Sequence, residues 1–268
     1  MASSLRTVIV TGGNGGIGWE AVKALYTSDK PYYIFMGSRS ASKGKEAKQL
    51  LIEECPSAKN TIEVLPLDID SDESIETAFQ QVSSSRGSID CLVNNAGANY
   101  DIAHLKGEMG LRDSFTKAYN TNVAGTHVMT HTFMPLLLKS TDPRLIFVAG
   151  LANITRAAEN YFPAPKVPAG WPKPNPGFEV ISYRASKCAL NMLMLDWNYK
   201  LQADGVKVWC VGPGMLATNL GGFGKEKAAA MGAGHPSAGG DIIRRVVEGE
   251  RDADTGKIVI KDGGISPW

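Results

Sequence analysis

The sequence of 268 residues lacks several features that would place it in other classes of protein. Its formal net charge is only +1, so no surplus of basic residues indicates binding to nucleic acid. No apolar run approaches the roughly 18 residues that a membrane-spanning helix requires. Residues 1–6 have none of the parts of a signal peptide. We therefore expect a cytoplasmic protein that contacts neither membranes nor nucleic acid.

Cysteine and histidine are also scarce, with four residues of each. The cysteines show no metal-ligand spacing, and the histidines form no cluster with carboxylates. We predict reduced and mostly packed thiols, without a structural disulfide and without a metal site. The cysteines are Cys55, Cys91, Cys188 and Cys210.

What the sequence does contain is a regular alternation of strand-like and helical segments. The predicted strands are residues 7–11, 32–37, 61–66, 89–93, 144–149, 206–211 and 257–260. The predicted helices lie near residues 17–28, 43–54, 72–84, 112–138, 181–203 and 238–249. This order predicts one α/β domain over residues 1–268, built as a Rossmann-like, doubly wound parallel sheet flanked by helices. Ligands of such sheets bind beyond the carboxyl ends of the strands.

A glycine-rich turn follows the first predicted strand and leads directly into a helix. Residues 11–18 read T-G-x-x-x-G-x-G, a spacing that differs from the general G-x-G-x-x-G fingerprint. Glycine permits positive φ and a close approach of the backbone to a pyrophosphate, and the start of a helix attracts negative charge. We predict a dinucleotide site here, although a glycine-rich surface turn would explain the motif taken alone.

Tyr183 and Lys187 form the second informative pattern. Four residues apart on a helix, the two side chains share one face. A lysine ammonium there favours the tyrosinate and lowers a phenol pKa that is ordinarily about 10. The tyrosine could then transfer a proton near neutral pH, which is what a carbonyl reductase requires. The spacing Y-x-x-x-K is common by itself, and it gains weight from the turn upstream.

The end of the second predicted strand bears on the choice of cofactor. Ser38 and Arg39 stand where an NAD enzyme usually places a carboxylate for the ribose hydroxyls. The planar cationic fork of arginine suits phosphate oxygens, so we predict NADP(H) as cofactor, with a preference for NADPH. The alternative is that Arg39 is merely solvated on a loop.

Six motifs in register resemble those of the short-chain dehydrogenase/reductase family, and the resemblance runs along nearly the whole chain. They are residues 11–18, Asp68 after the third strand, residues 94–97 (N-N-A-G), Asn122 in an N-T-N-V segment, Tyr183 with Lys187, and Pro213-Gly214 followed by Thr218. The resemblance implies an NADP(H)-dependent oxidoreductase. The cofactor-binding residues that it implies are Gly12, Asn14, Gly16, Ile17, Gly18, Ser38, Arg39, Asp68, Ile69, Asn95, Ala96, Gly97, Asn122, Tyr183, Lys187, Pro213, Gly214, Leu216 and Thr218.

The same resemblance implies three catalytic residues. Tyr183 would donate the proton to the substrate oxygen as hydride arrives from the nicotinamide. Lys187 would hold the nicotinamide ribose and lower the pKa of the tyrosine, and Asn122 would bind a water that links the lysine to solvent. The plainer alternatives are that Asn122 interrupts a helix by bonding to backbone and that Tyr183 is an ordinary half-buried tyrosine.

One departure from the family pattern concerns the end of the fifth strand, where the family usually has a serine that binds the substrate carbonyl. That place falls on Ala149 or Gly150, and neither has a side-chain donor. Losing one oxyanion donor costs on the order of 10²–10³ in rate. Three explanations stay open: Asn153 or Thr155 supplies the hydrogen bond, the substrate is an imine or iminium, or the protein is a cofactor-binding, non-redox (pericyclase-like) enzyme of secondary metabolism.

Residues 151–180 form a proline-rich insertion, which we predict to be an extended, stiff loop acting as a lid. Its aromatic residues either wall a bulky or aromatic substrate or anchor the loop to the protein; they are Tyr161, Phe162, Trp171 and Phe178. The insertion resembles that of monomeric carbonyl reductases in the family, where it covers the helices that relatives use to form tetramers. That resemblance implies a monomer, although a homo-oligomer stays open.

Residues 219–236 are glycine-rich, and we predict a substrate-closing flap. We expect Trp268 to dock against the body of the protein. The function that the sequence predicts is NADPH-dependent reduction of a carbonyl on a small, bulky or aromatic organic substrate. An NADPH-sensing regulatory protein is the alternative from another class.

Overall fold

A computed structural model describes residues 5–149, 154–159, 167–174, 180–222 and 224–268. Eight strands in these ranges form one sheet in the order β3-β2-β1-β4-β5-β6-β7-β8. Neighbouring strands are parallel, apart from the antiparallel pair of β7 and β8. The strands are β1 (Arg6–Val10), β2 (Tyr32–Ser38), β3 (Thr61–Pro66), β4 (Cys91–Asn94), β5 (Arg144–Val148), β6 (Lys207–Gly212), β7 (Ile258–Ile260) and β8 (Ile265–Ser266).

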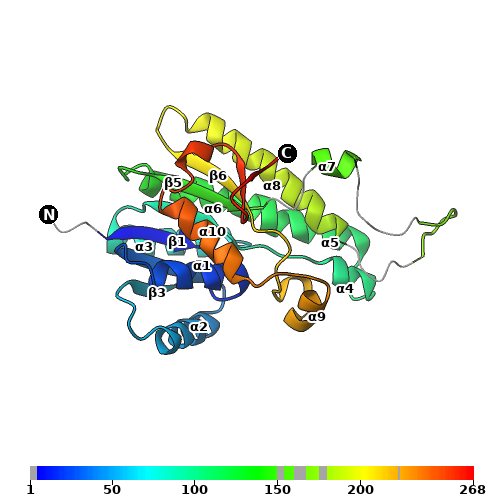
Figure 1. Cartoon of the computed structure of the whole chain (residues 1–268), viewed down its shortest axis with the longest axis horizontal. Helices are drawn as coiled ribbons and strands as arrows, with labels where there is room; N and C mark the ends of the chain where they lie inside the picture. Colours follow the sequence, from blue (N-terminus) through cyan, green and yellow to red (C-terminus); the bar gives the residue numbers. More distant parts are fainter. Residues whose placement is uncertain (1–4, 150–153, 160–166, 175–179, 223) are drawn as a thin grey trace.

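Helices cover both faces of this sheet (Figure 1). The apolar core on one face includes side chains of α1 (Gly16–Tyr26), α2 (Ala41–Glu54) and α10 (Ser237–Val247). The core on the other face includes side chains of α3 (Asp72–Arg86), α6 (Thr126–Leu137) and α8 (Ile181–Lys200). The predicted Rossmann-like sheet flanked by helices is therefore confirmed.

Burial on both faces explains why the strands read as continuous apolar runs. In β1, Ile9 belongs to one core, whereas Val8 and Val10 belong to the other. Successive side chains of a strand point to opposite faces, so most strand positions in a sheet covered on both sides are apolar.

The predicted helix 112–138 contains a change of pitch. Its parts are α5 (Leu111–Tyr119), the π-helical turn η1 (Asn120–Gly125) and α6. A Cβ at Gly125 would lie 2.2 Å from the carbonyl oxygen of Ile69, so only glycine allows the turn to pass this backbone so closely. Such π-turns occur frequently at functional sites, and this one carries Asn122.

Several short elements have no counterpart in the sequence-based prediction, because one or two turns give too little periodicity to detect. They are β8, α4 (Asp101–Leu105), α7 (Ile154–Glu159), α9 (Lys225–Ala230) and the 3₁₀ turns η2 (Leu220–Gly222) and η3 (Asp252–Asp254). Within the described ranges, none of the helices has the length and apolar character needed to cross a membrane.

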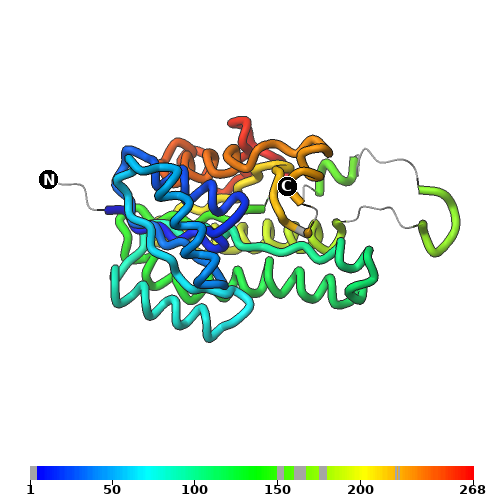
Figure 2. The backbone as a smooth tube through the Cα atoms, turned by 90° about the horizontal axis from the view of Figure 1, so that it is seen from below, coloured from blue at the N-terminus to red at the C-terminus, as the bar shows by residue number. Residues whose placement is uncertain are grey.

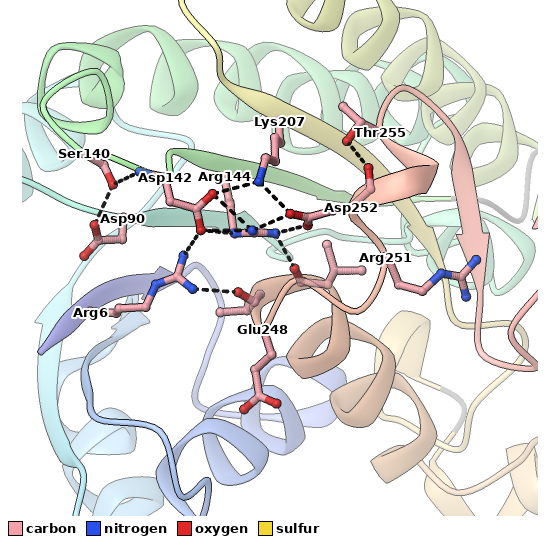
Figure 3. Close-up of polar contacts among 12 residues, drawn as sticks. Arg6, Asp90, Ser140, Asp142, Arg144, Lys207, Glu248, Arg251, Asp252 and Thr255 are labelled. Carbon is pink, nitrogen blue, oxygen red and sulfur yellow. Dashed lines mark hydrogen bonds and ion pairs between the residues drawn. The ribbon is translucent and has the colours of Figure 1, made fainter. Parts of the chain in front are cut away.

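An ion network joins the amino ends of three strands (Figure 3). Arg144, at the start of β5, donates hydrogen bonds to both carboxylate oxygens of Asp252 and of Asp142. Lys207, at the start of β6, bridges the same two carboxylates, and Arg6 of β1 donates to Asp142 at 2.9 Å. Because the strands are parallel, this network lies at the edge of the sheet opposite to the expected ligand site.

Candidate active site

The glycine-rich turn after β1 has the backbone geometry that a dinucleotide site needs. Gly12 and Gly16 have φ values of 62° and 53°, in the left-handed region that favours glycine. The residue at the N-cap of α1 is Gly15, whose lack of a side chain leaves the first N–H groups of the helix for an anionic ligand. These residues fit the pyrophosphate of a nicotinamide dinucleotide.

The end of β4 is tied directly to this turn. The hydroxyl oxygen of Thr11 accepts hydrogen bonds from the backbone N–H groups of Asn95 and Ala96, each at 2.9 Å. The Asn95 side chain donates to the carbonyl oxygen of Thr11 at 2.8 Å. A Cβ at Gly18 would lie 2.3 Å from the oxygen of Gly12 and 2.4 Å from the Asn95 amide nitrogen. Asn95 and Gly18 therefore hold the shape of the turn.

The end of β2 lies beside the same turn, since the N–H of Gly13 donates to the carbonyl oxygen of Gly37 at 2.8 Å. Ser38 is buried, and its hydroxyl donates to the carbonyl oxygen of Ser40. Arg39 is exposed at the start of the following loop. A cationic side chain thus stands at this strand end, where an adenosine ribose would be expected.

Three predicted residues, Asn122, Lys187 and Gly97, meet beyond the carboxyl ends of β4 and β5. A Cβ at Gly97 would lie 3.0 Å from Oδ1 of Asn122 and 3.2 Å from Nζ of Lys187. Nζ of Lys187 donates to the carbonyl oxygen of Val148, the last residue of β5, at 2.8 Å. Sequence motifs that are far apart along the chain therefore form one cluster.

Asn122 uses its whole side chain within the protein. Its Oδ1 accepts from the N–H of Ala98 at 2.8 Å, and its Nδ2 donates to the carbonyl oxygen of Ala98 and to the hydroxyl of Ser186. Ser186 in turn donates to the carbonyl oxygen of Tyr183 at 2.7 Å. The π-turn thus connects the segment after β4 to the helix that carries Tyr183.

Burial dominates the electrostatics of the tyrosine and lysine pair. It lowers the pKa of Lys187 from 10.5 to about 8, whereas it raises the pKa of Tyr183. Nζ of Lys187 lies 5.7 Å from the centre of the Tyr183 ring. The direction of the pKa shift at Tyr183 is opposite to the one expected from the sequence, because burial penalises the charged phenolate.

The remaining predicted cofactor residues lie in the segments after β6 and β3 and within the glycine turn itself. A Cβ at Gly16 would lie 3.3 Å from Cγ2 of Thr218, so the segment after β6 reaches the turn. Gly214 has a φ of 78°, and both Pro213 and Leu216 are buried. In the segment after β3, Ile69 is buried, and Asp68 accepts a hydrogen bond from the N–H of Asp70. Asn14 and Ile17, within the turn and the start of α1, are partly exposed.

The end of β5 supplies no hydroxyl at the place of the missing serine. Ala149 is buried, while Gly150 and Asn153 lie outside the described residues. Thr155 is exposed on α7, and its hydroxyl and its N–H both donate to the carbonyl oxygen of Trp268. Thr155 is therefore not the replacement that the sequence suggested, since its hydroxyl is engaged elsewhere. Trp268 packs against the core, as expected.

Within the predicted insertion, the structure describes α7 and residues 167–174, and the latter lie away from the body of the protein at one end (Figures 1 and 2). Trp171 is 87% exposed, so it neither walls the site nor anchors the loop. The other aromatics of the insertion fall outside the described residues. Met192 and Tyr199 of α8 are exposed. The predictions of a lid and of a monomer stay untested.

The predicted flap begins after Thr218 and contains η2 and α9. Its last part is joined to the segment after β6, because the N–H of Ala217 donates to the carbonyl oxygen of Gly234 at 2.8 Å. Whether the flap closes over a substrate stays a prediction.

Sequence reasoning missed two residues that hold this site together. Ser186 links Asn122 to Tyr183, and Asp101 accepts hydrogen bonds from the start of α8. Ser186 stands within the Tyr183–Lys187 motif and could have been noticed there. Asp101 gave no signal, because its partners are 81 and 82 positions away in the sequence.

Comparison with known proteins agrees with this geometry. The family described as short chain dehydrogenase matches residues 6–162 and 173–228. The short-chain dehydrogenase/reductase tropE of Talaromyces stipitatus is 44% identical over 272 residues, covering 99% of both chains. The short-chain dehydrogenase/reductase eupG of Phoma sp is 39% identical, covering 97% of this chain and 96% of its own.

The fold has solved counterparts. The crystal structure of an NADPH-bound carbonyl reductase from chicken fatty liver matches with a TM-score of 0.77 at 22% identity, covering 98% of this chain and 99% of that one. At this identity the likeness concerns the fold alone. The family match and the two relatives nevertheless span most of the sequence, and the protein therefore belongs to the short-chain dehydrogenase/reductase family of oxidoreductases.

Proposed function

We propose that the protein is an NADPH-dependent reductase that acts on a carbonyl group of a bulky or aromatic organic substrate. The observation that carries this proposal is the cluster of Lys187, Asn122 and Gly97. Lys187 lies on the same helix as Tyr183, and Asn122 is linked to Tyr183 through Ser186. Bound at the glycine turn, NADPH would supply the hydride. The protein's own residues would position the substrate and deliver the proton.

Tyr183 is the proton donor in this proposal, and Lys187 provides the positive charge beside it. With a pKa of about 8, Lys187 is mostly protonated at neutral pH and can bind ribose hydroxyls. Asn122 has its side chain engaged in three hydrogen bonds, so it would contribute to a water site only through its backbone. Burial raises the pKa of Tyr183 and so keeps the phenol protonated at neutral pH. Because a phenol with a raised pKa is a weaker acid, the positive charge of Lys187 would have to favour the tyrosinate as the proton leaves.

NADPH is the proposed cofactor because Arg39 is exposed at the end of β2. Its guanidinium could pair with a 2′-phosphate, whereas the carboxylate usual in NAD enzymes would repel one. Turnover is expected to be at least tenfold better with NADPH than with NADH at equal concentrations. Equal turnover with both cofactors would contradict the preference.

Reduction of a ketone or aldehyde should require Tyr183. In Tyr183→Phe, cofactor oxidation with such a substrate is expected to fall by about 10²-fold or more, since the phenol supplies the proton. The measurement is the loss of NADPH absorbance with a panel of bulky aromatic carbonyl compounds. A Tyr183→Phe variant as active as the wild type would contradict the proposal.

Reduction of an imine or iminium is the second candidate, favoured by the lack of a hydroxyl at Ala149 and Gly150, the two possible places of the serine, and by the engagement of Thr155 with Trp268. A cationic substrate needs no oxyanion donor and no proton from the enzyme, so its reduction should survive Tyr183→Phe. A pericyclase-like enzyme would convert its substrate with no loss of NADPH. An NADPH-sensing regulator would bind the cofactor and turn over nothing.

A further inference from the structure

The helix that carries Tyr183 begins without a local cap. Val180 occupies the N-cap position of α8, and its side chain cannot accept a hydrogen bond. Ordinarily an Asn, Asp, Ser or Thr there satisfies the free N–H groups of the first turn. Ser182 and Tyr183 are the second and third residues of the helix, the positions whose N–H groups such a cap would bind.

Asp101 supplies this cap from a distant part of the chain. Its Oδ1 accepts a hydrogen bond from the N–H of Ser182 at 2.9 Å, and its Oδ2 accepts one from the N–H of Tyr183 at 3.0 Å. Asp101 is only 2% exposed. A carboxylate in this position also interacts favourably with the dipole of a 20-residue helix.

The segment that carries Asp101 is itself held at the site. Ala98 is bonded through both its N–H and its carbonyl to the Asn122 side chain. The N–H of Asp101 donates to the side chain of Asn99 at 2.9 Å, which sets the turn into α4. The stretch from Gly97 to Asp101 therefore connects the surroundings of Lys187 to the first turn of α8.

Tyr183 is consequently fixed by side chains on both sides of its backbone. Its N–H donates to Asp101, and its carbonyl oxygen accepts from Ser186. We propose that Asp101 is a positioning residue that sets the place of the Tyr183 phenol relative to the segment after β4. The catalytic role of Asp101 rests on the proposed function. The two hydrogen bonds that Asp101 accepts from the first turn of α8, called the tether below, do not depend on it.

The test uses Asp101→Asn, which keeps the volume of the side chain but replaces one acceptor oxygen by a donor. We expect kcat for carbonyl reduction to fall about 10- to 100-fold, because small displacements of a catalytic group have effects of this order. The dissociation constant for NADPH, measured by fluorescence, should change by less than kcat does, since the glycine turn and Arg39, which would bind the phosphates, keep their contacts.

Asp90→Asn is the matched control. Asp90 likewise accepts a hydrogen bond from a backbone N–H, that of Thr7 at 2.7 Å, but at the opposite edge of the sheet (Figure 3). We expect its kcat to stay within twofold of wild type at a temperature below both melting transitions. An Asp101→Asn variant that loses no more kcat than Asp90→Asn would overturn the proposal.

A double variant separates positioning from a general loss of structure. If Asp101 acts through the phenol, adding Asp101→Asn to Tyr183→Phe should cause no further loss of kcat. An additional loss of similar size in the Tyr183→Phe background would overturn the inference.

Hydrogen exchange tests the tether without any assay of turnover. In the wild-type protein the N–H groups of Ser182 and Tyr183 should exchange slowly, and exchange at the rate of a frayed helix end would overturn the inference. A wild type that binds no NADPH would refute the proposed function, while slow exchange at these two positions would still support the tether.

Discussion

At the scale of single residues, the chemistry of the site depends on a buried lysine. Lys187 is 4% exposed, and its Nζ donates to the carbonyl oxygen of Val148. Its spacing from Tyr183 could be read from the sequence because both lie on one helix. The burial that lowers the pKa of Lys187 and raises that of Tyr183 could not, because it comes from strands and loops elsewhere in the chain.

The lowered pKa of Lys187 predicts a pH-dependent cost to stability. Below about pH 8 the folded protein carries a buried ammonium, which lowers its free energy of unfolding. As pH rises from about 8 toward 10.5, Lys187 loses its proton in the folded state before it does so in the unfolded state, and this loss of stability is relieved. At about 1.4 kcal/mol per pKa unit, the full change is roughly 3 kcal/mol. Relative to Lys187→Met, wild type should therefore gain up to that much in free energy of unfolding across this range.

Urea unfolding of the two proteins at pH 7.5 and at pH 10 measures this difference. Effects of other titrating groups cancel in the comparison, since both proteins share them. A difference between wild type and Lys187→Met that is the same at both pH values would show that Lys187 titrates normally in the folded protein.

At the scale of elements, the order strand, glycine turn and helix was predictable, because glycine spacing and β-branched runs are local signals. The π-turn that carries Asn122 and the cap that Asp101 provides for α8 were not. Gly125 must pass the backbone at Ile69, and Asp101 meets α8 across 81 residues of sequence. Such features follow from packing between elements, which no local pattern records.

The glycine turn gives a prediction at this scale. A Cβ at Gly18 would collide with the oxygen of Gly12, so Gly18→Ala should lower the free energy of unfolding by about 1–3 kcal/mol and weaken NADPH binding at least tenfold. At Gly15 an added Cβ meets no atom of the described residues within 4 Å, and φ is −167°, an extended value that any residue adopts.

Gly15→Ala is therefore the matched control for stability, and its unfolding free energy should stay within about 0.5 kcal/mol of wild type. Chemical denaturation of both variants provides the measurement. Equal stability of Gly18→Ala and Gly15→Ala would mean that the turn relaxes freely around an added methyl group.

At the scale of the whole molecule, the carboxyl and amino ends of the strands carry different groups of residues. The candidate site occupies the carboxyl edge, where the sequence predicted it from the ends of parallel strands. The amino edge carries the network of Arg144, Asp142, Asp252 and Lys207 (Figure 3), which sequence reasoning did not foresee. A buried Arg144 requires these carboxylates, because an unpaired buried charge is strongly destabilising.

This separation predicts that the amino edge controls acid stability without affecting turnover. Hydrogen bonds from Arg144 lower the pKa of Asp252 to about 2, so its contribution to stability is present above about pH 4 and is lost as pH falls through 2. Asp252→Asn should lower the free energy of unfolding by about 1–2 kcal/mol at pH 7, a modest value because the Asp252 side chain is 36% exposed. The variant should also lose less stability than wild type between pH 4 and pH 2, the acid limb of the stability curve.

Melting curves of Asp252→Asn from pH 7 to pH 2, together with kcat at pH 7, test both halves of this prediction. Asp241→Asn, which removes an exposed partner of Arg244, is the control and should keep the wild-type acid limb. The kcat of Asp252→Asn should stay within twofold of wild type, because the substitution leaves the contacts around the candidate site at the carboxyl edge unchanged. A large loss of kcat would mean that strain at the amino edge passes through the strands to the cluster around Lys187.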